Sequence, residues 1–166
     1  MLTQLEVMEI FRTHVPDGVD IYFVPAKDFI TTALNNPYIQ KQVEIGIYTP
    51  DNIWMDFLSP ACSYSQFNRL EVCYDLLKNH AVGVDDEDLI RAYIVMMAVH
   101  EAHHFHVNHT PTNVEEHAEA EAACLRETTE NFPDLSKKAA EFEAQSLTYK
   151  RVYDRIRLQV AKKVFS

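Results

Sequence analysis

The chain has 166 residues, enough for one compact domain with a hydrophobic core (residues 1–166) but short for two. With 47% hydrophobic and 24% charged residues and only three glycines, its composition is that of a globular protein and excludes a low-complexity disordered chain. The whole chain has a net charge of −10, and residues 1–135 carry 22 Asp and Glu against seven Lys and Arg, a net of −15, so we expect no nucleic-acid partner.

Three features bear on the compartment of the protein. The sequence has no run of about 18 apolar residues, so we expect no membrane association. Residues 1–6 lack the basic start and apolar stretch of a signal peptide. Cys62, Cys73 and Cys124 are odd in number and scattered, as is typical of reduced thiols rather than a disulfide framework. The sequence therefore predicts a cytoplasmic protein.

Hydrophobic periodicity and turn residues predict the secondary structure. In chain order, the expected elements are a helix over 3–13, a strand over 20–24, a helix over 27–35, a β-hairpin over 43–58, and helices over 65–80, from 85 or 86 to about 108, 114–130 and 136–163. The hairpin is predicted because β-forming residues flank the turn sequence Thr49-Pro50-Asp51-Asn52. Residues 110–113 contain Pro111 and should separate two helices.

The last predicted helix differs from the rest of the chain in charge. Residues 136–166 carry eight Lys and Arg against three Asp and Glu, which gives this segment a net charge of +5. Its apolar residues recur at helical spacing, so the helix is amphipathic. We expect the basic side chains to form a solvated helix face, although they could also bind an acidic surface.

A histidine cluster carries the clearest chemistry. Six of the eight histidines lie between positions 100 and 117, and His100-Glu101-Ala102-His103-His104 forms an HExxH motif at the end of a nearly uncharged helix. Residues four apart share one helix face, so His100 and His104 can bind one metal ion, and zinc is the usual occupant. Glu101 is rotated by about 100° from His100 and is placed to act as a general base. The remaining histidines of this helix and loop, expected not to be ligands, are His103, His106 and His109.

A third ligand should come from the helix over 114–130. If the two helices form an antiparallel hairpin that turns near residue 111, His104 lies level with about residue 118 and Glu119 fits best. Glu115 lies one turn earlier on the same face and could serve instead, or could hydrogen-bond a ligand histidine. The other candidates that stay open on this helix are Glu116, His117 and Glu121.

The stretch 43–130, with its hairpin, its HExxH helix and the following glutamate-rich helix, resembles the zincin metallopeptidases, specifically small intracellular members of the gluzincin type. The resemblance implies that His100 and His104 bind Zn²⁺, that Glu101 is the general base, and that Glu119 is the third ligand. It also implies an α+β fold: a mostly helical domain with a small antiparallel or mixed sheet packed on the active-site helix.

Two further expectations follow from the resemblance. An edge strand of the sheet should hold the substrate backbone by strand addition, and this strand would belong to the 43–58 hairpin. Family members often add a distant His, Tyr or Arg that stabilises the oxyanion. The candidates for that role on the last helix are Tyr149, Tyr153 and Arg155.

The sequence therefore predicts a zinc metallopeptidase that hydrolyses a protein or peptide substrate. The alternative is a zinc-containing binding or regulatory protein without catalysis, in which a fourth protein ligand closes the metal site. Glu101 and His104 also form the Glu-x-x-His pair of di-iron bundles, but such a site needs a second pair, and the sequence offers none.

Overall fold

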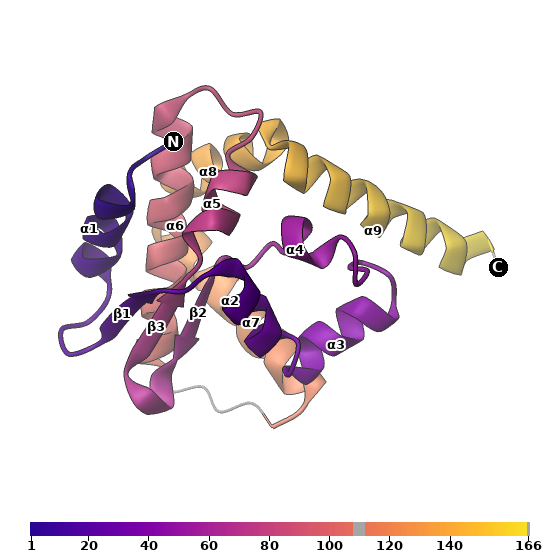
Figure 1. The fold of residues 1–166 in the computed structure, drawn as a ribbon, viewed down its shortest axis with the longest axis horizontal. Helices are drawn as coiled ribbons and strands as arrows, with labels where there is room; N and C mark the ends of the chain where they lie inside the picture. The colour runs from indigo at the N-terminus through magenta and orange to yellow at the C-terminus, as the bar shows by residue number, and fades with distance from the viewer. Residues whose placement is uncertain (108–111, 166) are drawn as a thin grey trace.

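The computed structural model describes residues 1–107 and 112–165. Its helices are α1 (Gln4–His14), α2 (Ala26–Ala33), α3 (Pro37–Glu44), α4 (Ile53–Asp56), α5 (Tyr74–His80), α6 (Glu87–His106), α7 (Val114–Asn131), α8 (Pro133–Gln145) and α9 (Leu147–Phe165). Its strands are β1 (Asp20–Phe23), β2 (Ala61–Tyr64) and β3 (Arg69–Val72), with a 3₁₀ turn at Ser65–Phe67. The fold is α+β and mostly helical, as predicted (Figure 1).

The sheet is small and mixed. Its strand order is β1-β3-β2, with β1 parallel and β2 antiparallel to β3. Strands β2 and β3 form a hairpin that turns through Asn68, whose φ of 47° lies in the left-handed region that asparagine tolerates better than most residues. Strand β2 lies at an edge of the sheet and packs against α6, so one edge of the sheet runs beside the predicted metal helix.

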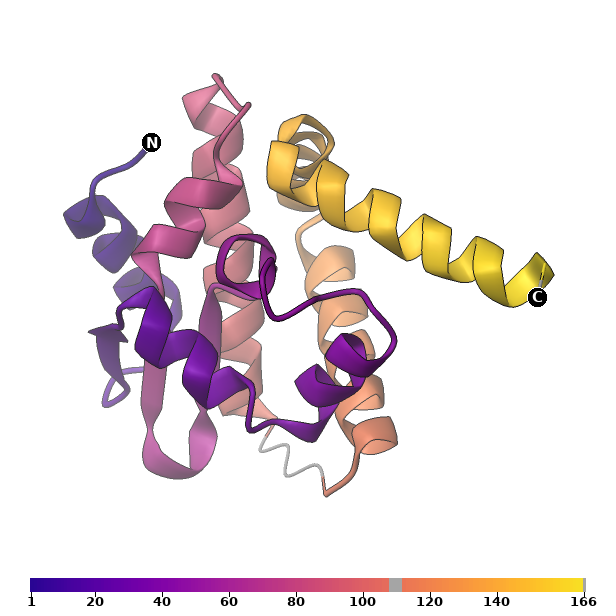
Figure 2. The same ribbon diagram turned by 45° about the vertical axis from the view of Figure 1, so that its right-hand side comes forward.

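Helix α6 is the centre of the fold. It packs against α1, α7, α8 and β2, and ten of its 20 residues are buried (Figure 2). Its first turn is capped by Asp86, whose carboxylate accepts from the Asp88 backbone N–H, and Glu87 and Asp88 favour the positive end of the helix dipole. Helix α6 therefore fixes the position of its last turn, where the HExxH motif lies, relative to the rest of the core.

The predicted β-hairpin over 43–58 is wrong. Residues 43 and 44 end helix α3, and residues 53–56 form the short helix α4. Asn36 caps α3 by accepting from the Tyr38 backbone N–H, and Pro37 occupies the first helical position, so the Asn-Pro pair starts a helix at this point. Local β-propensity was overridden because Ile39, Ile53 and their neighbours bury apolar side chains in a helical cluster.

The remaining differences concern two helix boundaries. The predicted helix over 65–80 contains strand β3 before α5, because Leu70 and Val72 are buried in the sheet. The predicted helix over 136–163 is two helices separated at Ser146, where Leu147 N–H donates to the carbonyl of Val82. The predicted helix end near residue 108 and part of the following break lie outside the described residues.

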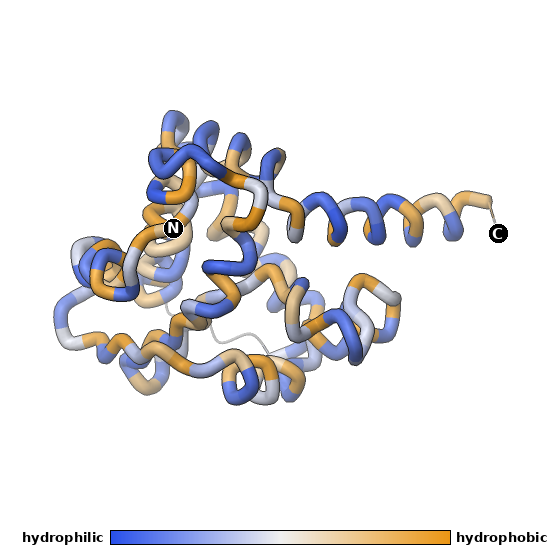
Figure 3. Tube along the Cα trace, turned by 45° about the horizontal axis from the view of Figure 1, so that its top comes forward, coloured by the Kyte–Doolittle hydropathy of each residue, from blue (hydrophilic) through white to orange (hydrophobic). Residues whose placement is uncertain are grey.

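Helix α9 leaves the rest of the molecule after its first turns (Figures 1 and 3). Tyr149 and Val152 near its start are buried, whereas Val160, Val164 and Phe165 near its end are exposed. Across the described residues, no helix combines the length and the apolar character that would be needed to cross a bilayer.

Candidate metal centre

Two imidazoles and one carboxylate converge where α6 and α7 pack together. The Nε2 atoms of His100 and His104 lie 3.2 Å apart. The Glu121 carboxylate bridges them, with Oε2 3.1 Å from His100 Nε2 and Oε1 3.1 Å from His104 Nε2. A tetrahedral zinc ion with ligand distances of about 2.0–2.1 Å holds its nitrogen and oxygen ligands roughly 3.3 Å apart, so these three side chains fit such an ion.

The electrostatics of this trio also suit a cation. Burial opposes the charged form of both imidazoles, but the hydrogen bonds that the imidazoles donate to Cys124 and Glu121 and the field of Glu101 outweigh burial, raising the pKa of His100 to about 11 and that of His104 to about 10. Burial would raise the pKa of Glu121, but its bonds to both histidines lower that pKa strongly. The trio thus binds positive charge firmly, and a metal ion would replace the protons on the two Nε2 atoms.

Glu101 lies beside the two histidines but faces the sheet. It is buried, and its Oε2 accepts a 2.5 Å hydrogen bond from the hydroxyl of Ser63 on β2. Burial raises the pKa of Glu101, while His100, His104 and the Ser63 hydroxyl act in the opposite direction. A buried carboxyl group held in this way between the Ser63 hydroxyl and two imidazoles has the setting of a general base.

The expected position of Glu119 beside the histidines needs correction. Glu119 is exposed, and Glu121 occupies the place beside the imidazoles. The two glutamates are separated by about 200° around α7, so only one of them can face α6. Glu121 lies within the stretch 118–122 that was expected to lie level with the two histidines, but the sequence does not fix which face of α7 meets α6. Whether Glu119 binds metal stays a prediction, but the geometry favours Glu121.

The other candidates on α7 have different surroundings. Glu115 is exposed, and the carboxylate of Glu116 accepts from the Thr112 backbone and hydroxyl at the start of the helix. His117 lies one turn before Glu121 and contacts α3 instead, with its ring 5.2 Å from that of Tyr38 and its Nε2 3.3 Å from the Asn36 amide. None of these contacts brings a further candidate to the imidazole pair.

Sequence reasoning missed Cys124 as a member of this group. It is fully buried on α7, and its sulfur, His100 and His104 can present ligand atoms that all lie within 4.8 Å of one another. The spacing of three residues from Glu121 was the available signal, because it places both side chains on the same helix face. His100, His104 and Cys124 therefore form one group that could hold a metal ion, and His100, His104 and Glu121 form another.

The three oxyanion candidates on α9 are engaged elsewhere. Tyr149 is buried and its hydroxyl lies 2.7 Å from that of Tyr93. The Tyr153 hydroxyl donates to Glu143 at 2.8 Å, and burial, together with the charge of Glu143, raises the pKa of Tyr153. Arg155 donates to Asp56 at 2.8 Å. These bonds attach α9 to the core.

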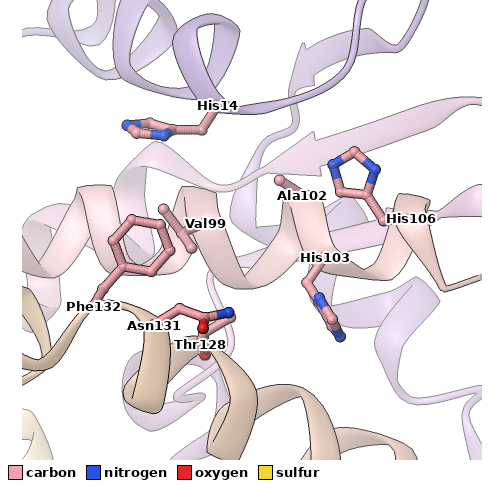
Figure 4. A pocket seen from close by; sticks show the side chains of 8 residues that line it. All are labelled: His14, Val99, Ala102, His103, His106, Thr128, Asn131 and Phe132. Carbon is pink, nitrogen blue, oxygen red and sulfur yellow. The ribbon is translucent and has the colours of Figure 1, made fainter.

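Other histidines of the cluster line a separate pocket of about 200 Å³ between α1, α6 and α7 (Figure 4). Its lining residues are His14, Val99, Ala102, His103, His106, Thr128, Asn131 and Phe132. His103 Nε2 lies 3.2 Å from the Glu127 carboxylate. Figure 4 shows the three imidazoles entering from different sides of the pocket rather than converging. His109 lies outside the described residues.

Comparison of the chain with protein-family models, with curated proteins and with solved structures gives no match. The function is therefore inferred from the geometry of the site itself.

Proposed function

We propose that this protein is a zinc-dependent metallopeptidase. The observation that carries the proposal is the convergence of two imidazole Nε2 atoms and the Glu121 carboxylate at distances of 3.1–3.2 Å, with the buried Glu101 one residue along from His100. Three protein ligands leave a fourth tetrahedral position for water or substrate, which is the arrangement of catalytic rather than structural zinc sites.

In the proposed reaction, His100, His104 and Glu121 hold the ion. Bound zinc supplies Lewis acidity that activates water and polarises the peptide carbonyl. Glu101 accepts the proton of the attacking water and passes it to the leaving amine. Ser63 donates to Glu101 and keeps its carboxylate next to the imidazole pair while leaving the second carboxylate oxygen for that proton.

The surroundings of Glu101 support a peptide as substrate. Strand β2 is an edge strand, and Ser63 in its middle donates to Glu101, so an extended chain paired with the open side of β2 would pass near the general base. The edge strand was expected in the 43–58 hairpin, which is helical; β2 over Ala61–Tyr64 takes its place in the proposal. A cytoplasmic location is proposed on the reduced state of the three cysteines, all of which are free.

The decisive experiment compares wild type with Glu101→Gln. We expect the variant to bind zinc with wild-type stoichiometry but to lose cleavage of a peptide library by about 100-fold or more, because the amide cannot accept the proton. Metal content by elemental analysis and cleavage by mass spectrometry measure the two quantities. Undiminished cleavage by Glu101→Gln, or no cleavage by zinc-loaded wild type, would contradict the proposal.

Cys124 favours one second candidate, a zinc protein that binds a partner without catalysis. If the Cys124 sulfur joined His100, His104 and Glu121 on the ion, four protein ligands would close the site, as in structural zinc centres. This candidate predicts bound zinc, a metal–sulfur bond and no cleavage of any peptide.

A further inference from the structure

Cys124 contacts His100 at two points. Its sulfur lies 3.4 Å from the backbone carbonyl oxygen of His100 and 3.5 Å from the Nδ1 atom of the same residue. Cys124 is fully buried, so these contacts form away from water. The thiol therefore touches both the backbone and the ring of one proposed metal ligand.

The number of available protons determines the direction of both bonds. A thiol carries one proton, and the geometry assigns that proton to the His100 carbonyl, which can only accept. Nδ1 must then carry a proton of its own and donate to the sulfur. This arrangement leaves Nε2 as the nitrogen that faces His104 and Glu121, where a metal ion would bind.

We propose that Cys124 is a positioning residue for the metal centre: its thiol fixes the orientation and tautomer of His100 so that Nε2 is presented to the ion. The inference rests on the proposed metal centre. Metal-binding histidines usually donate their second ring N–H to a carboxylate, a carbonyl or water. Here the closely packed α6–α7 interface places a small buried thiol at that position.

The Cys124 sulfur lies within 4.8 Å of ligand atoms of both His100 and His104, and its contact with Nδ1 of His100 favours the positioning role over direct ligation. The two nitrogens of an imidazole point to different sides of the ring, and Cys124 contacts Nδ1, whereas Glu121 and His104 meet Nε2. An ion held by Nε2 therefore lies on the side of His100 away from its contact with the thiol. Cys124 acts on the ion through His100, and the fourth coordination position stays free for the proposed reaction.

The test measures zinc affinity of the full chain by competition with a chelator at constant pH. Cys124→Ala should weaken zinc binding by about 10- to 100-fold, the usual effect of removing the partner of a ligand histidine. Cys124→Ser should restore most of that affinity, because a hydroxyl can also donate to the carbonyl and accept from Nδ1. The matched control is Cys73→Ala. Cys73 is buried in the apolar cluster that contains Ile39 and Ile53, so this variant should leave zinc affinity unchanged.

A second measurement needs no variant and replaces zinc with cobalt(II). Wild type should show the visible bands of a nitrogen- and oxygen-ligated ion, without the near-ultraviolet charge-transfer band of a cobalt–thiolate bond. That band in wild type, or full zinc affinity in Cys124→Ala, would overturn the positioning role. Both readouts concern metal binding alone, so they are independent of the cleavage assay with Glu101→Gln that tests the proposed reaction.

Discussion

At the scale of single residues, the site depends on which side chains share a helix face. His100 and His104 are one turn apart on α6, and Glu121 and Cys124 are one turn apart on α7. Where the two faces meet, imidazole nitrogens of the histidines lie 3.1–3.5 Å from the Glu121 oxygens and the Cys124 sulfur. Glu119 belongs to the same helix and has the same chemistry as Glu121, but it points away from the meeting face. Position around the helix, and not residue type, separates the two glutamates.

A matched pair of variants tests this assignment. Removing a residue that only hydrogen-bonds a metal ligand typically lowers metal affinity by roughly 10- to 100-fold. Glu121→Gln should lower zinc affinity by more than this, because it removes a ligand together with its negative charge. Glu119→Gln makes the same chemical change on the exposed face and should bind zinc like wild type. Isothermal titration with zinc measures both; a larger loss in Glu119→Gln than in Glu121→Gln would return the third ligand to position 119.

His80 provides a pH-dependent contribution to stability. It is buried, its Nε2 donates to the Phe57 carbonyl at 2.8 Å, and its Nδ1 accepts from the Tyr93 hydroxyl at 3.0 Å. Burial lowers the pKa of His80 from 6.5 to about 4, although the Phe57 bond and the charge of Asp56 oppose the shift. The unfolded chain therefore binds a proton between pH 6.5 and pH 4 that the folded protein does not.

Stability should accordingly fall as pH drops through this window, by roughly 3 kcal/mol from His80 alone. In His80→Gln, a neutral amide can keep a donor and an acceptor at this position, so that part of the pH dependence should vanish. Urea unfolding of wild type and variant at pH 7 and pH 4 gives the change in the free energy of unfolding with pH for each protein. Equal changes in the two proteins would show that His80 does not remain neutral in the folded protein.

At the scale of elements, α9 is attached to the core by ion pairs at its first turns. Arg151 and Arg155 donate to the two oxygens of the buried Asp56 on α4, at 2.9 and 2.8 Å. Within the described part of the chain, the buried Nε and Nη2 of Arg155 have no hydrogen-bond partner. Asp56 is thus the main counter-charge of Arg155. The outer half of α9 exposes apolar side chains, and Figure 3 colours several of its residues as hydrophobic.

Loss of the Asp56 carboxylate should destabilise the folded protein. Asp56→Asn should reduce the free energy of unfolding by about 3 kcal/mol, because it leaves a partly buried guanidinium without its counter-ion. Asp154→Asn breaks the exposed pair with Arg157 and serves as the control, with an expected change below about 1 kcal/mol. Chemical denaturation measures both, and equal effects would mean that burial of Asp56 adds nothing.

At the scale of the whole molecule, the proposed ion links α6 to α7. The ligands come from two helices that are joined through residues 107–113, and both helices pack against α8. Anything that binds the folded state alone stabilises it in proportion to the logarithm of its concentration over its dissociation constant. A bound ion should therefore stabilise the entire fold and not only the site.

Metal removal should lower the melting temperature. Zinc at about 100 times its dissociation constant adds about 2.7 kcal/mol, which corresponds to roughly 5–10 °C for a domain of this size. Differential scanning calorimetry with zinc and with a chelator measures the shift in wild type. His100→Ala should melt at the same temperature in both conditions; a full zinc-dependent shift in that variant would place the ion elsewhere.

Local signals account for what the sequence predicted well. Helices α1, α6 and α7 were predicted within a few residues because their signals are local: periodic apolar residues for α1, and capping residues directly before α6 and α7 at Asp86 and Asn113. The pairing of His100 with His104 is likewise local, since one helical turn dictates it. The hairpin over 43–58 was wrong because β-propensity depends on the surface against which a segment packs.

The sequence by itself determined the HExxH helix, the pairing of His100 with His104 and the neighbouring Glu101, because the α-helix fixes the geometry of residues four or fewer apart. Only the tertiary structure decided that Glu121 and Cys124 meet that pair and that Ser63 on β2 meets Glu101. Those contacts depend on the register between α6 and α7 and on the packing of the sheet edge. Register between separate elements is set by the packing of the whole core, which no local pattern of residues records.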